Sequence, residues 1–241
     1  MMKTAIVTGG TQGIGREICC LLLMKGYKVY TTFAHNAETA KDAASIFACI
    51  SKDFEIRQVD QSIKGSIHSF AEYILSKESA IDCIVCNAGT TLRKSAFEIT
   101  DDEWESVMLT NVNSHFYLIR DLYHAIPNDS RIVFIGSMLA VYPHGTSLPY
   151  GVTKSAIHAL ALNLVKEFEG TGTTINVIAP GFIDTPWQKN KPAEIRENIC
   201  RKTALHRFGT PDEVANTVDF IISNPFVNGS VIELSGGYCF K

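Results

Sequence analysis

Near its start the chain reads TGGTQGIG, Thr8–Gly15, a glycine-rich turn between two segments of different character. The segment before it, residues 3–8, is short and apolar, which is typical of a strand. In the segment after it, apolar side chains recur every three or four residues from Ile14, which predicts a helix with one apolar face. Glycines permit the positive φ angles and close backbone approach of such a turn. The first N–H groups of the helix therefore face the turn unpaired, which favours an anion site, although a merely tight turn has the same glycines.

The rest of the 241 residues repeat this alternation of short apolar strands and longer helical segments. Strands are predicted at residues 3–8, 28–33, 55–59, 81–86, 131–135, 174–179 and 230–234. Helices are predicted from Ile14 to a cap at Gly26 and at residues 37–50, 66–76, 100–123, 150–168 and from 210 onward. Strands that are apolar throughout pair in parallel with helices on both faces. We therefore expect an α/β fold, a single doubly wound Rossmann-type domain over residues 1–241 with a seven-stranded parallel sheet.

The carboxyl ends of parallel strands meet at one edge of the sheet, where doubly wound folds bind their ligands. The loops that follow four of the predicted strands begin at Gly9, Asn87, Ser137 and Pro180. We expect these four segments to converge on one site.

Composition excludes several classes of protein. A net charge of −3 argues against bulk electrostatic binding of nucleic acid or membrane, and no apolar run is long enough to span a bilayer. Seven cysteines, an odd number, suit a reducing compartment, so a cytoplasmic protein is expected. Cys83 and Cys86 have redox or zinc spacing, but they fall on a predicted strand and point to opposite faces, which favours a core role. No cluster of ligands has metal-binding spacing, so no metal is expected.

The order of the motifs resembles that of the short-chain dehydrogenase/reductase family over nearly the whole chain. The family has Thr-Gly-x-x-x-Gly-x-Gly in its first turn, here Thr8–Gly15, and Asn-Ala-Gly after the fourth strand, here Asn87–Gly89. Further matches follow in the family's order: Asn111, Ser137, Tyr150 and Lys154, Pro180-Gly181 and Thr185. The resemblance is strongest to 3-oxoacyl-[acyl-carrier-protein] reductases and acetoacetyl-CoA reductases, enzymes that suggest a role in fatty acid biosynthesis.

The resemblance implies which residues bind a nicotinamide dinucleotide and which catalyse. The implied catalytic residues are Asn111, Ser137, Tyr150 and Lys154. The implied cofactor contacts are Gly9, Thr11, Gln12, Gly13, Ile14, Gly15, Asp60, Asn87, Ala88, Gly89, Tyr150, Lys154, Pro180, Gly181, Ile183 and Thr185. A substrate lid is expected at about residues 185–208, which carry several basic side chains.

Tyr150 and Lys154 lie one helical turn apart, so their side chains share a face. A phenol is a reluctant acid at neutral pH, and a nearby ammonium would lower its pKa and fit it for proton transfer with a carbonyl or an alcohol. An oxidised nicotinamide would add a second positive charge. The alternative is an exposed tyrosine–lysine pair without a function.

By resemblance, the Ser137 hydroxyl holds the substrate oxygen, and Asn111 kinks its helix and holds a water near the lysine. Simple capping by Ser137 and an ordinary polar position for Asn111 are the alternatives. A serine hydrolase is disfavoured because Gly136-Ser137-Met138-Leu139 lacks the second glycine of a nucleophile elbow. His144 is a weak candidate for a substrate contact, and His158 is expected to be structural.

NAD specificity usually requires an acid at the end of the second strand, where this chain has Phe33. NADP(H) is therefore preferred and NAD(H) remains possible, since no Arg or Lys stands ready for the 2′-phosphate. His35, Asn36 and Thr11 are weak phosphate candidates. Asp60, by resemblance an adenine contact, could alternatively just end a strand.

The main hypothesis is an NADP(H)-dependent reductase that converts a carbonyl to an alcohol, with a 3-oxoacyl thioester as substrate. Alternatives are an alcohol, sugar or hydroxysteroid dehydrogenase and a catalytically silent dinucleotide sensor. Acyl carrier protein is a possible partner, but Asn128-Asp129 and Thr171-Gly172 stand where such reductases often carry docking cations. The resemblance also implies a homotetramer, with an apolar tail, Tyr238–Phe240, tucked into a neighbour.

Overall fold

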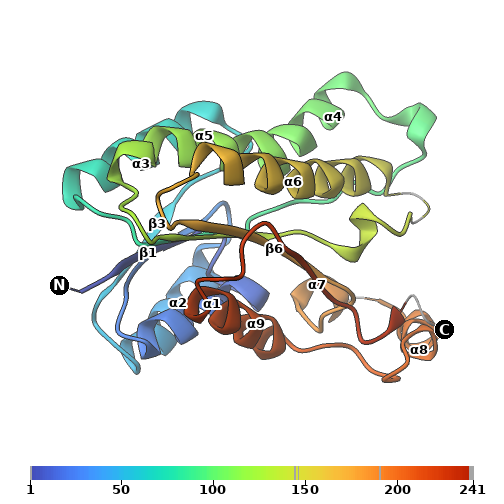
Figure 1. Cartoon of the computed structure of the whole chain (residues 1–241). Helices are drawn as coiled ribbons and strands as arrows, with labels where there is room; N and C mark the ends of the chain where they lie inside the picture. The colour runs from blue at the N-terminus through green and yellow to red at the C-terminus, as the bar shows by residue number, and fades with distance from the viewer. Residues whose placement is uncertain (1, 144, 146, 190, 239–241) are drawn as a thin grey trace.

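A computed structural model describes residues 2–143, 145, 147–189 and 191–238. Its centre is a seven-stranded parallel sheet in the order β3-β2-β1-β4-β5-β6-β7 (Figure 1). The strands are β1 (Thr4–Val7), β2 (Lys28–Phe33), β3 (Phe54–Gln58), β4 (Cys83–Cys86), β5 (Arg131–Ile135), β6 (Thr174–Pro180) and β7 (Val231–Leu234). The order reverses between β1 and β4, which opens a crevice for a ligand at that point. The predicted α/β doubly wound fold is confirmed.

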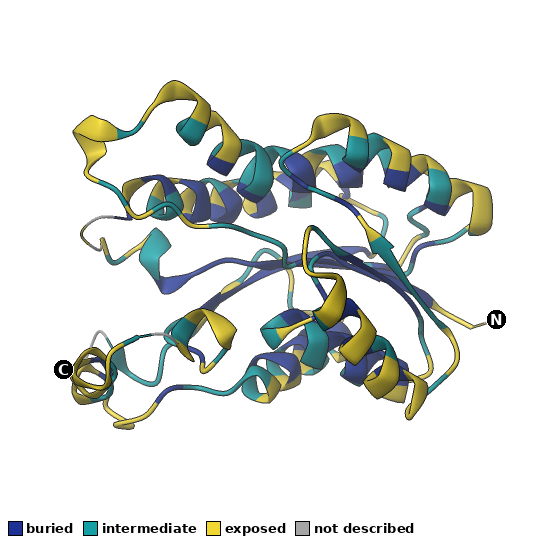
Figure 2. Ribbon diagram, turned by 180° about the vertical axis from the view of Figure 1, so that it is seen from behind, coloured by how far each residue is buried: buried dark blue, intermediate teal, exposed yellow. Residues whose placement is uncertain are grey.

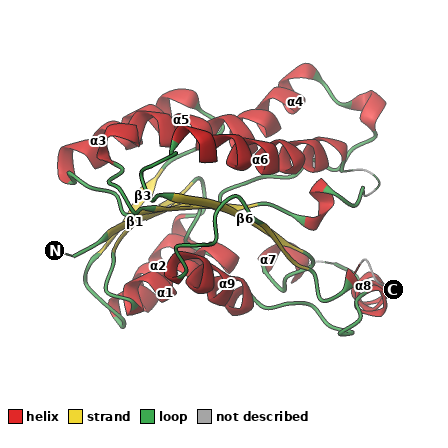
Figure 3. Cartoon of the chain, in the orientation of Figure 1, coloured by secondary structure: helices red, strands yellow, loops and turns green. Residues whose placement is uncertain are grey.

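Helices cover both faces of the sheet, as the alternation of strands and helices predicted (Figure 3). One layer contains α1 (Gly13–Met24), α2 (Ala37–Ala48) and α9 (Pro211–Ser223). The other contains α3 (Lys64–Lys77), α4 (Asp101–Met108), α5 (Ser114–Leu122) and α6 (Leu148–Glu167). Figure 2 shows buried residues concentrated on the sheet and on the helix faces turned toward it. Each layer therefore closes its own hydrophobic core against the sheet.

The predicted helix at residues 100–123 is interrupted in the structure. It begins with the predicted capping box of Thr100 and Glu103, but residues Leu109–Asn113 form a π-helical segment between α4 and α5. The prediction of one continuous α-helix was wrong. The spacing of apolar residues in the sequence does not reveal a single π-helical turn inside a longer helix. Asn111, where the family resemblance implied a kink, lies within this π-helical segment.

The cysteine-x-x-cysteine motif lies on β4 and belongs to the core. Cys83 packs in the core beneath α1, and Cys86 packs in the core on the opposite face. Burial raises the pKa of both thiols, so neither is ionised at neutral pH. The core interpretation is confirmed, and the cysteines that the structure describes are all free thiols. No helix in the described part of the chain is long and apolar enough to cross a membrane.

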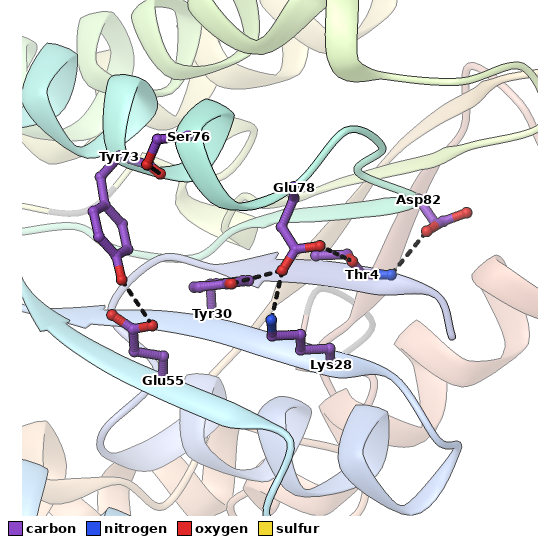
Figure 4. Close-up of polar contacts among 8 residues, drawn as sticks. All are labelled: Thr4, Lys28, Tyr30, Glu55, Tyr73, Ser76, Glu78 and Asp82. Carbon is purple, nitrogen blue, oxygen red and sulfur yellow. Dashed lines mark hydrogen bonds and ion pairs between the residues drawn. The ribbon is translucent and has the colours of Figure 1, made fainter. Parts of the chain in front are cut away.

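At the amino-terminal end of the sheet, one carboxylate accepts hydrogen bonds from side chains of two neighbouring strands (Figure 4). Glu78, just after α3, accepts hydrogen bonds from the Lys28 ammonium and the Tyr30 hydroxyl, both at 2.6 Å. A weaker bond at 3.4 Å comes from the Thr4 hydroxyl on β1. This clamp lies at the end of the sheet opposite the crevice, so it holds the strands in register without entering the ligand site.

Candidate active site

The loops at the carboxyl ends of the strands enclose a cleft of about 590 Å³, a size typical of small-molecule sites. The four loops expected to converge, beginning at Gly9, Asn87, Ser137 and Pro180, all contribute to its wall. Every residue that the resemblance assigns to the cofactor lines this cleft. The predicted cofactor contacts thus lie together in one cleft.

The glycine loop forms a cradle at the start of α1. Gly9 and Gly13 have positive φ angles of 65° and 53°. A Cβ on Gly15 would lie 2.4 Å from the Gly9 carbonyl oxygen, so only glycine fits there. The N-cap residue Gln12 makes no side-chain hydrogen bond to the helix, which leaves N–H groups of the first turn available to an anion. These features fit a dinucleotide pyrophosphate.

Tyr150 and Ser137 face each other at the other end of the cleft. Ser137 follows β5 and Tyr150 lies in the first turn of α6, and both side chains line the same cleft. Burial raises the pKa of the Tyr150 phenol, and the Ser137 side chain lowers it by less. The expectation of a lowered pKa is therefore wrong for this structure, because removal from water outweighs the effect of the Ser137 hydroxyl.

Lys154 lies one turn further along α6, buried beneath the cleft wall. Its Nζ donates to the Ile135 carbonyl oxygen at 2.7 Å and lies 5.6 Å from the centre of the Tyr150 ring. Burial lowers the pKa of Lys154 to about 8. The amine is thus close to the phenol ring and shares its wall of the cleft, but it does not reverse the rise of the phenol's pKa.

Asn111 lies behind the cleft rather than in it. Its side chain has no exposed surface and bridges two elements. Its Oδ1 accepts from the Thr90 N–H at 2.7 Å, and its Nδ2 donates to the Thr90 carbonyl and the Thr153 hydroxyl, both at 2.9 Å. Thr153 is next to Lys154, so Asn111 connects the loop after β4 to the lysine's turn of α6.

Two histidines near Lys154 are buried, and sequence analysis missed the first. His115 on α5 contacts the Ala88 carbonyl oxygen through Nε2 at 3.0 Å, which requires that nitrogen to carry the proton. Burial lowers the pKa of His115 to about 3, so the ring is neutral. His158 is buried in α6 behind Gly136, as the structural interpretation predicted. His144 lies outside the described residues.

The far end of the cleft is lined by residues from the end of β2 and the start of α2. Phe33, His35, Asn36 and Thr39 contribute there, together with Thr11 from the glycine loop. Asn36 caps α2, because its Oδ1 accepts from the N–H groups of Glu38 and Thr39, each at 3.1 Å. Asp60 also lines this end, and its carboxylate lies 3.5 Å from His35. This geometry is compatible with both interpretations of Asp60, as a residue that contacts the adenine and as one that simply ends a strand.

A segment after β6 covers part of the cleft. It contains α7 (Pro186–Lys189) and α8 (Ala193–Lys202), within the expected lid at 185–208. The methyl group of Thr185 would lie 3.3 Å from a Cβ on Gly13, so the lid begins directly over the glycine cradle. Trp187 and Gln188 of this expected lid line the cleft. Thr90, Ser106 and Thr110 also line it, and no motif in the sequence marked them.

The geometry defines a nucleotide-binding α/β protein with a Ser–Tyr–Lys arrangement beside the binding cleft. A family model, short chain dehydrogenase, matches residues 3–196. The 2-dehydro-3-deoxy-D-gluconate 5-dehydrogenase of Pseudoalteromonas atlantica is 32% identical over 98% of this chain and 95% of that protein. The Escherichia coli 3-oxoacyl-[acyl-carrier-protein] reductase FabG is 30% identical over 98% of this chain and 96% of that protein. A solved structure, the Pseudomonas aeruginosa RhlG/NADP active-site complex, superposes with a TM-score of 0.89 at 29% identity and covers 98% of this chain and 96% of that one.

The chain belongs to the short-chain dehydrogenase/reductase family, as its motifs indicated. It is an NAD(P)-dependent oxidoreductase that acts on a carbonyl or an alcohol of a small-molecule substrate.

Proposed function

We propose that the protein is an NADP(H)-dependent reductase that converts the carbonyl of a 3-oxoacyl thioester to an alcohol. The observation that carries the proposal is the presence of Ser137, Tyr150 and Lys154 together in the wall of the cleft that also contains the glycine cradle. Similarity to FabG over the full chain supports the 3-oxoacyl substrate.

In this proposal each residue of the site has a defined role. Tyr150 donates its phenolic proton to the carbonyl oxygen, and the Ser137 hydroxyl holds that oxygen while negative charge develops on it. Lys154 binds the nicotinamide ribose and favours the phenolate that remains. Asn111 is a positioning residue, because it contacts Thr90 and Thr153 rather than the cleft. The bound dinucleotide supplies the hydride.

The same cleft supports a preference for NADP(H). β2 ends in Phe33, so the position at which an acid would repel a 2′-phosphate carries no carboxylate. Thr11, His35 and Asn36 line the pocket at that end and offer hydrogen-bond donors. Among the described residues that line that end of the cleft, there is no Arg or Lys. Fluorescence titration with NADPH and NADH tests the preference, and tighter binding of NADH would contradict it.

The Tyr150→Phe variant tests the reaction. We expect it to bind NADPH as the unchanged protein does and to lose about 10²–10⁴-fold in turnover of a 3-oxoacyl thioester, the usual contribution of a general acid. Tyr123→Phe, an exposed tyrosine at the end of α5, is the control and should keep full activity. Full activity in Tyr150→Phe would remove the proposed proton donor. Absence of any carbonyl turnover in the unchanged protein would favour the silent dinucleotide sensor.

A sugar-acid dehydrogenase is the second candidate, because the relative at 32% identity is named as a 2-dehydro-3-deoxy-D-gluconate 5-dehydrogenase. The oxidised and reduced forms of that sugar acid can be tried as substrates, with the absorbance of the reduced dinucleotide as the readout. An acyl carrier protein is a candidate partner. Asp129 and Gly172, in the loops that would dock it, abut each other, and the Arg131 guanidinium donates to their carbonyl oxygens at 2.8 and 3.4 Å.

We also propose a homotetramer in the cytoplasm, formed through the helices around Asn111 and Tyr150. Exposed apolar side chains on α5 and α6, among them Phe116, Leu148 and Leu162, support a subunit interface there. The tail that we propose to dock into a neighbouring subunit includes Cys239 and Phe240, which lie outside the described residues. The ring of Tyr238 packs 5.6 Å from that of Phe182 in the same chain.

A further inference from the structure

A buried titratable side chain, His115 on α5, contacts the cleft wall from behind and has no part in the proposed reaction. It is 1% exposed. Its Nε2 donates to the Ala88 carbonyl at 3.0 Å, while its Nδ1 has no partner among the described residues. A buried nitrogen without a partner costs free energy that an apolar side chain of similar size would avoid. The bond to Ala88 is therefore what the histidine contributes at this position.

The loop after β4 depends on side chains for its backbone hydrogen bonds. The Thr8 hydroxyl accepts from the Ala88 N–H at 3.0 Å, and Asn111 binds both the N–H and the carbonyl of Thr90. The Ala88 carbonyl faces His115, and no other donor reaches it in the part of the chain that the structure describes. Without the imidazole, this carbonyl would therefore lose its anchor.

His115 and Asn111 reach the same loop because of their spacing. Asn111 lies in the π-helical segment Leu109–Asn113, and His115 follows four residues later in α5. Side chains four residues apart share a helical face. One face of this interrupted helix thus holds the loop after β4 at two points.

Ala88 lies between the glycine cradle and the wall that contains Lys154, and it lines the cleft with them. On one side, a Cβ on Gly9 would lie 3.1 Å from the Ala88 Cα. On the other side, a Cβ on Gly89 would lie 3.7 Å from the Lys154 Nζ. Rotation of the peptide that joins Ala88 to Gly89 would therefore change the shape of the cleft at both places.

The imidazole holds the carbonyl without adding a charge to the cleft wall. Burial lowers the pKa of His115 to about 3, so the ring is uncharged at neutral pH. Protonation would bury a second cation in a region that already holds Lys154, and the new Nδ1–H would be buried without an acceptor. The surroundings therefore favour the tautomer with its proton on Nε2.

We infer that His115 is a positioning residue for the dinucleotide, because its hydrogen bond to the Ala88 carbonyl fixes the peptide that lies between the glycine cradle and Lys154. It acts through the loop after β4 and does not touch the reacting atoms. The inference goes beyond the proposed function, since it holds for whichever carbonyl or alcohol the protein acts on.

Two variants, His115→Gln and His115→Leu, separate the hydrogen bond from the volume of the side chain. The glutamine amide can donate to the Ala88 carbonyl, whereas leucine cannot. Dissociation constants for NADPH and for NADH are measured by fluorescence titration of each variant. For the dinucleotide that binds more tightly, we expect His115→Leu to weaken binding about five- to tenfold, the effect of losing one neutral hydrogen bond. His115→Gln should stay within about twofold of the unchanged protein.

The control is His158→Leu, which replaces another buried histidine. Its Nε2 has no partner among the described residues, so the variant loses no bond of that nitrogen and should bind the dinucleotide within about twofold of the unchanged protein. A second measurement needs no variant: ¹⁵N NMR of the protein labelled in its histidines should show one ring that stays neutral from about pH 5 to pH 9, protonated on Nε2 alone. The signal of that ring is assigned by its absence in His115→Gln.

The inference is overturned by equal losses of affinity in His115→Gln and His115→Leu, by no loss in either, or by an equal loss in His158→Leu. Reduced turnover in His115→Leu at unchanged dinucleotide affinity would also overturn it, because the residue would then act on the reacting groups. If His115→Leu does not fold, the affinity of His115→Gln and the tautomer decide: weak binding or a proton on Nδ1 would contradict the proposed contact. None of these results requires reduction of a 3-oxoacyl thioester, so failure of the proposed function would be seen separately.

Discussion

The carboxylate of Glu78 offers a quantitative test of how the sheet is held together, through the variant Glu78→Gln (Figure 4). The carboxylate accepts two short bonds, from Lys28 and Tyr30, and its side chain is only 17% exposed. A bond to a charged group contributes about 1.5–3 kcal/mol and a neutral one about 0.5–1.5 kcal/mol, so the amide loses about 1 kcal/mol per bond. Lys28 is 35% exposed, and solvent screening reduces the total to about 1–2 kcal/mol.

The matched control is Glu55→Gln, which changes a carboxylate in the same close-up. Glu55 pairs with Arg57 at 3.0 Å and accepts from Tyr73 at 3.0 Å, but its side chain and that of Arg57 are more exposed, at 35% and 41%. We expect Glu55→Gln to cost less than about 0.5 kcal/mol. Urea denaturation followed by circular dichroism measures both free energies of unfolding, at constant slope. A loss in Glu78→Gln no larger than in Glu55→Gln would refute the reasoning.

The effect of Glu78 depends on pH in a defined direction. Burial acts to raise the pKa of Glu78, but hydrogen bonds from Lys28 and Tyr30 outweigh it and leave that pKa below its ordinary value. A carboxyl with a lowered folded-state pKa stabilises the fold above its unfolded pKa and loses that contribution as pH falls through the folded value. The difference between the unchanged protein and Glu78→Gln should therefore be full at pH 7 and shrink below about pH 4, near the reference pKa of glutamate.

Two further outcomes follow from the site. Gly136→Ala would place a Cβ 2.4 Å from His158 Nε2, so we expect the free energy of unfolding in urea to fall by about 1–3 kcal/mol and turnover to be impaired, because Ser137 is adjacent. Gly65→Ala, in open space on α3, is the control and should be neutral or slightly stabilising. Equal stability of the two variants would contradict the contact. The pKa of Lys154 is lowered to about 8, so between pH 8 and its unfolded value near 10.4 the unfolded chain binds more protons and stability from this group rises with pH. Thermal melting across that range should show a shallower rise in Lys154→Met than in the unchanged protein, and identical slopes would argue against a buried, perturbed amine.

Local sequence patterns predicted the sheet because each strand carries its own signal. β2 and β5 have the predicted bounds, and the other strands differ by one or two residues at their ends. Both capping boxes, at Thr100 and Thr210, begin helices as predicted. The π-helical segment at Asn111 could not be predicted from periodicity, because a wide turn depends on the contacts of Asn111 with Thr90 and Thr153, which lie far from it in sequence.

The chemistry of the site was harder to predict than its location. Motif spacing placed Tyr150 and Lys154 on one face of α6, but the direction of the Tyr150 pKa depends on how deeply the phenol is buried, a property of the folded wall. Thr90, Ser106 and Thr110 have no motif around them, and they line the cleft only because the loop after β4 and the helical segment before Asn111 meet there in the fold. Periodicity reports which residues form an element, whereas the lining of a cleft depends on how elements meet.

The raised pKa of Tyr150 bears on the direction of the reaction. A buried phenol with a raised pKa remains protonated at neutral pH, which is the form needed to donate a proton to a carbonyl oxygen. Oxidation of an alcohol needs the phenolate instead, and the free energy required to form it increases with the pKa. The Ser137 side chain acts against this rise but does not cancel it, so the phenol favours the protonated form that carbonyl reduction needs. If instead the pH profile of alcohol oxidation reached its plateau below pH 7, the phenol would have to be more acidic than its surroundings in this structure allow.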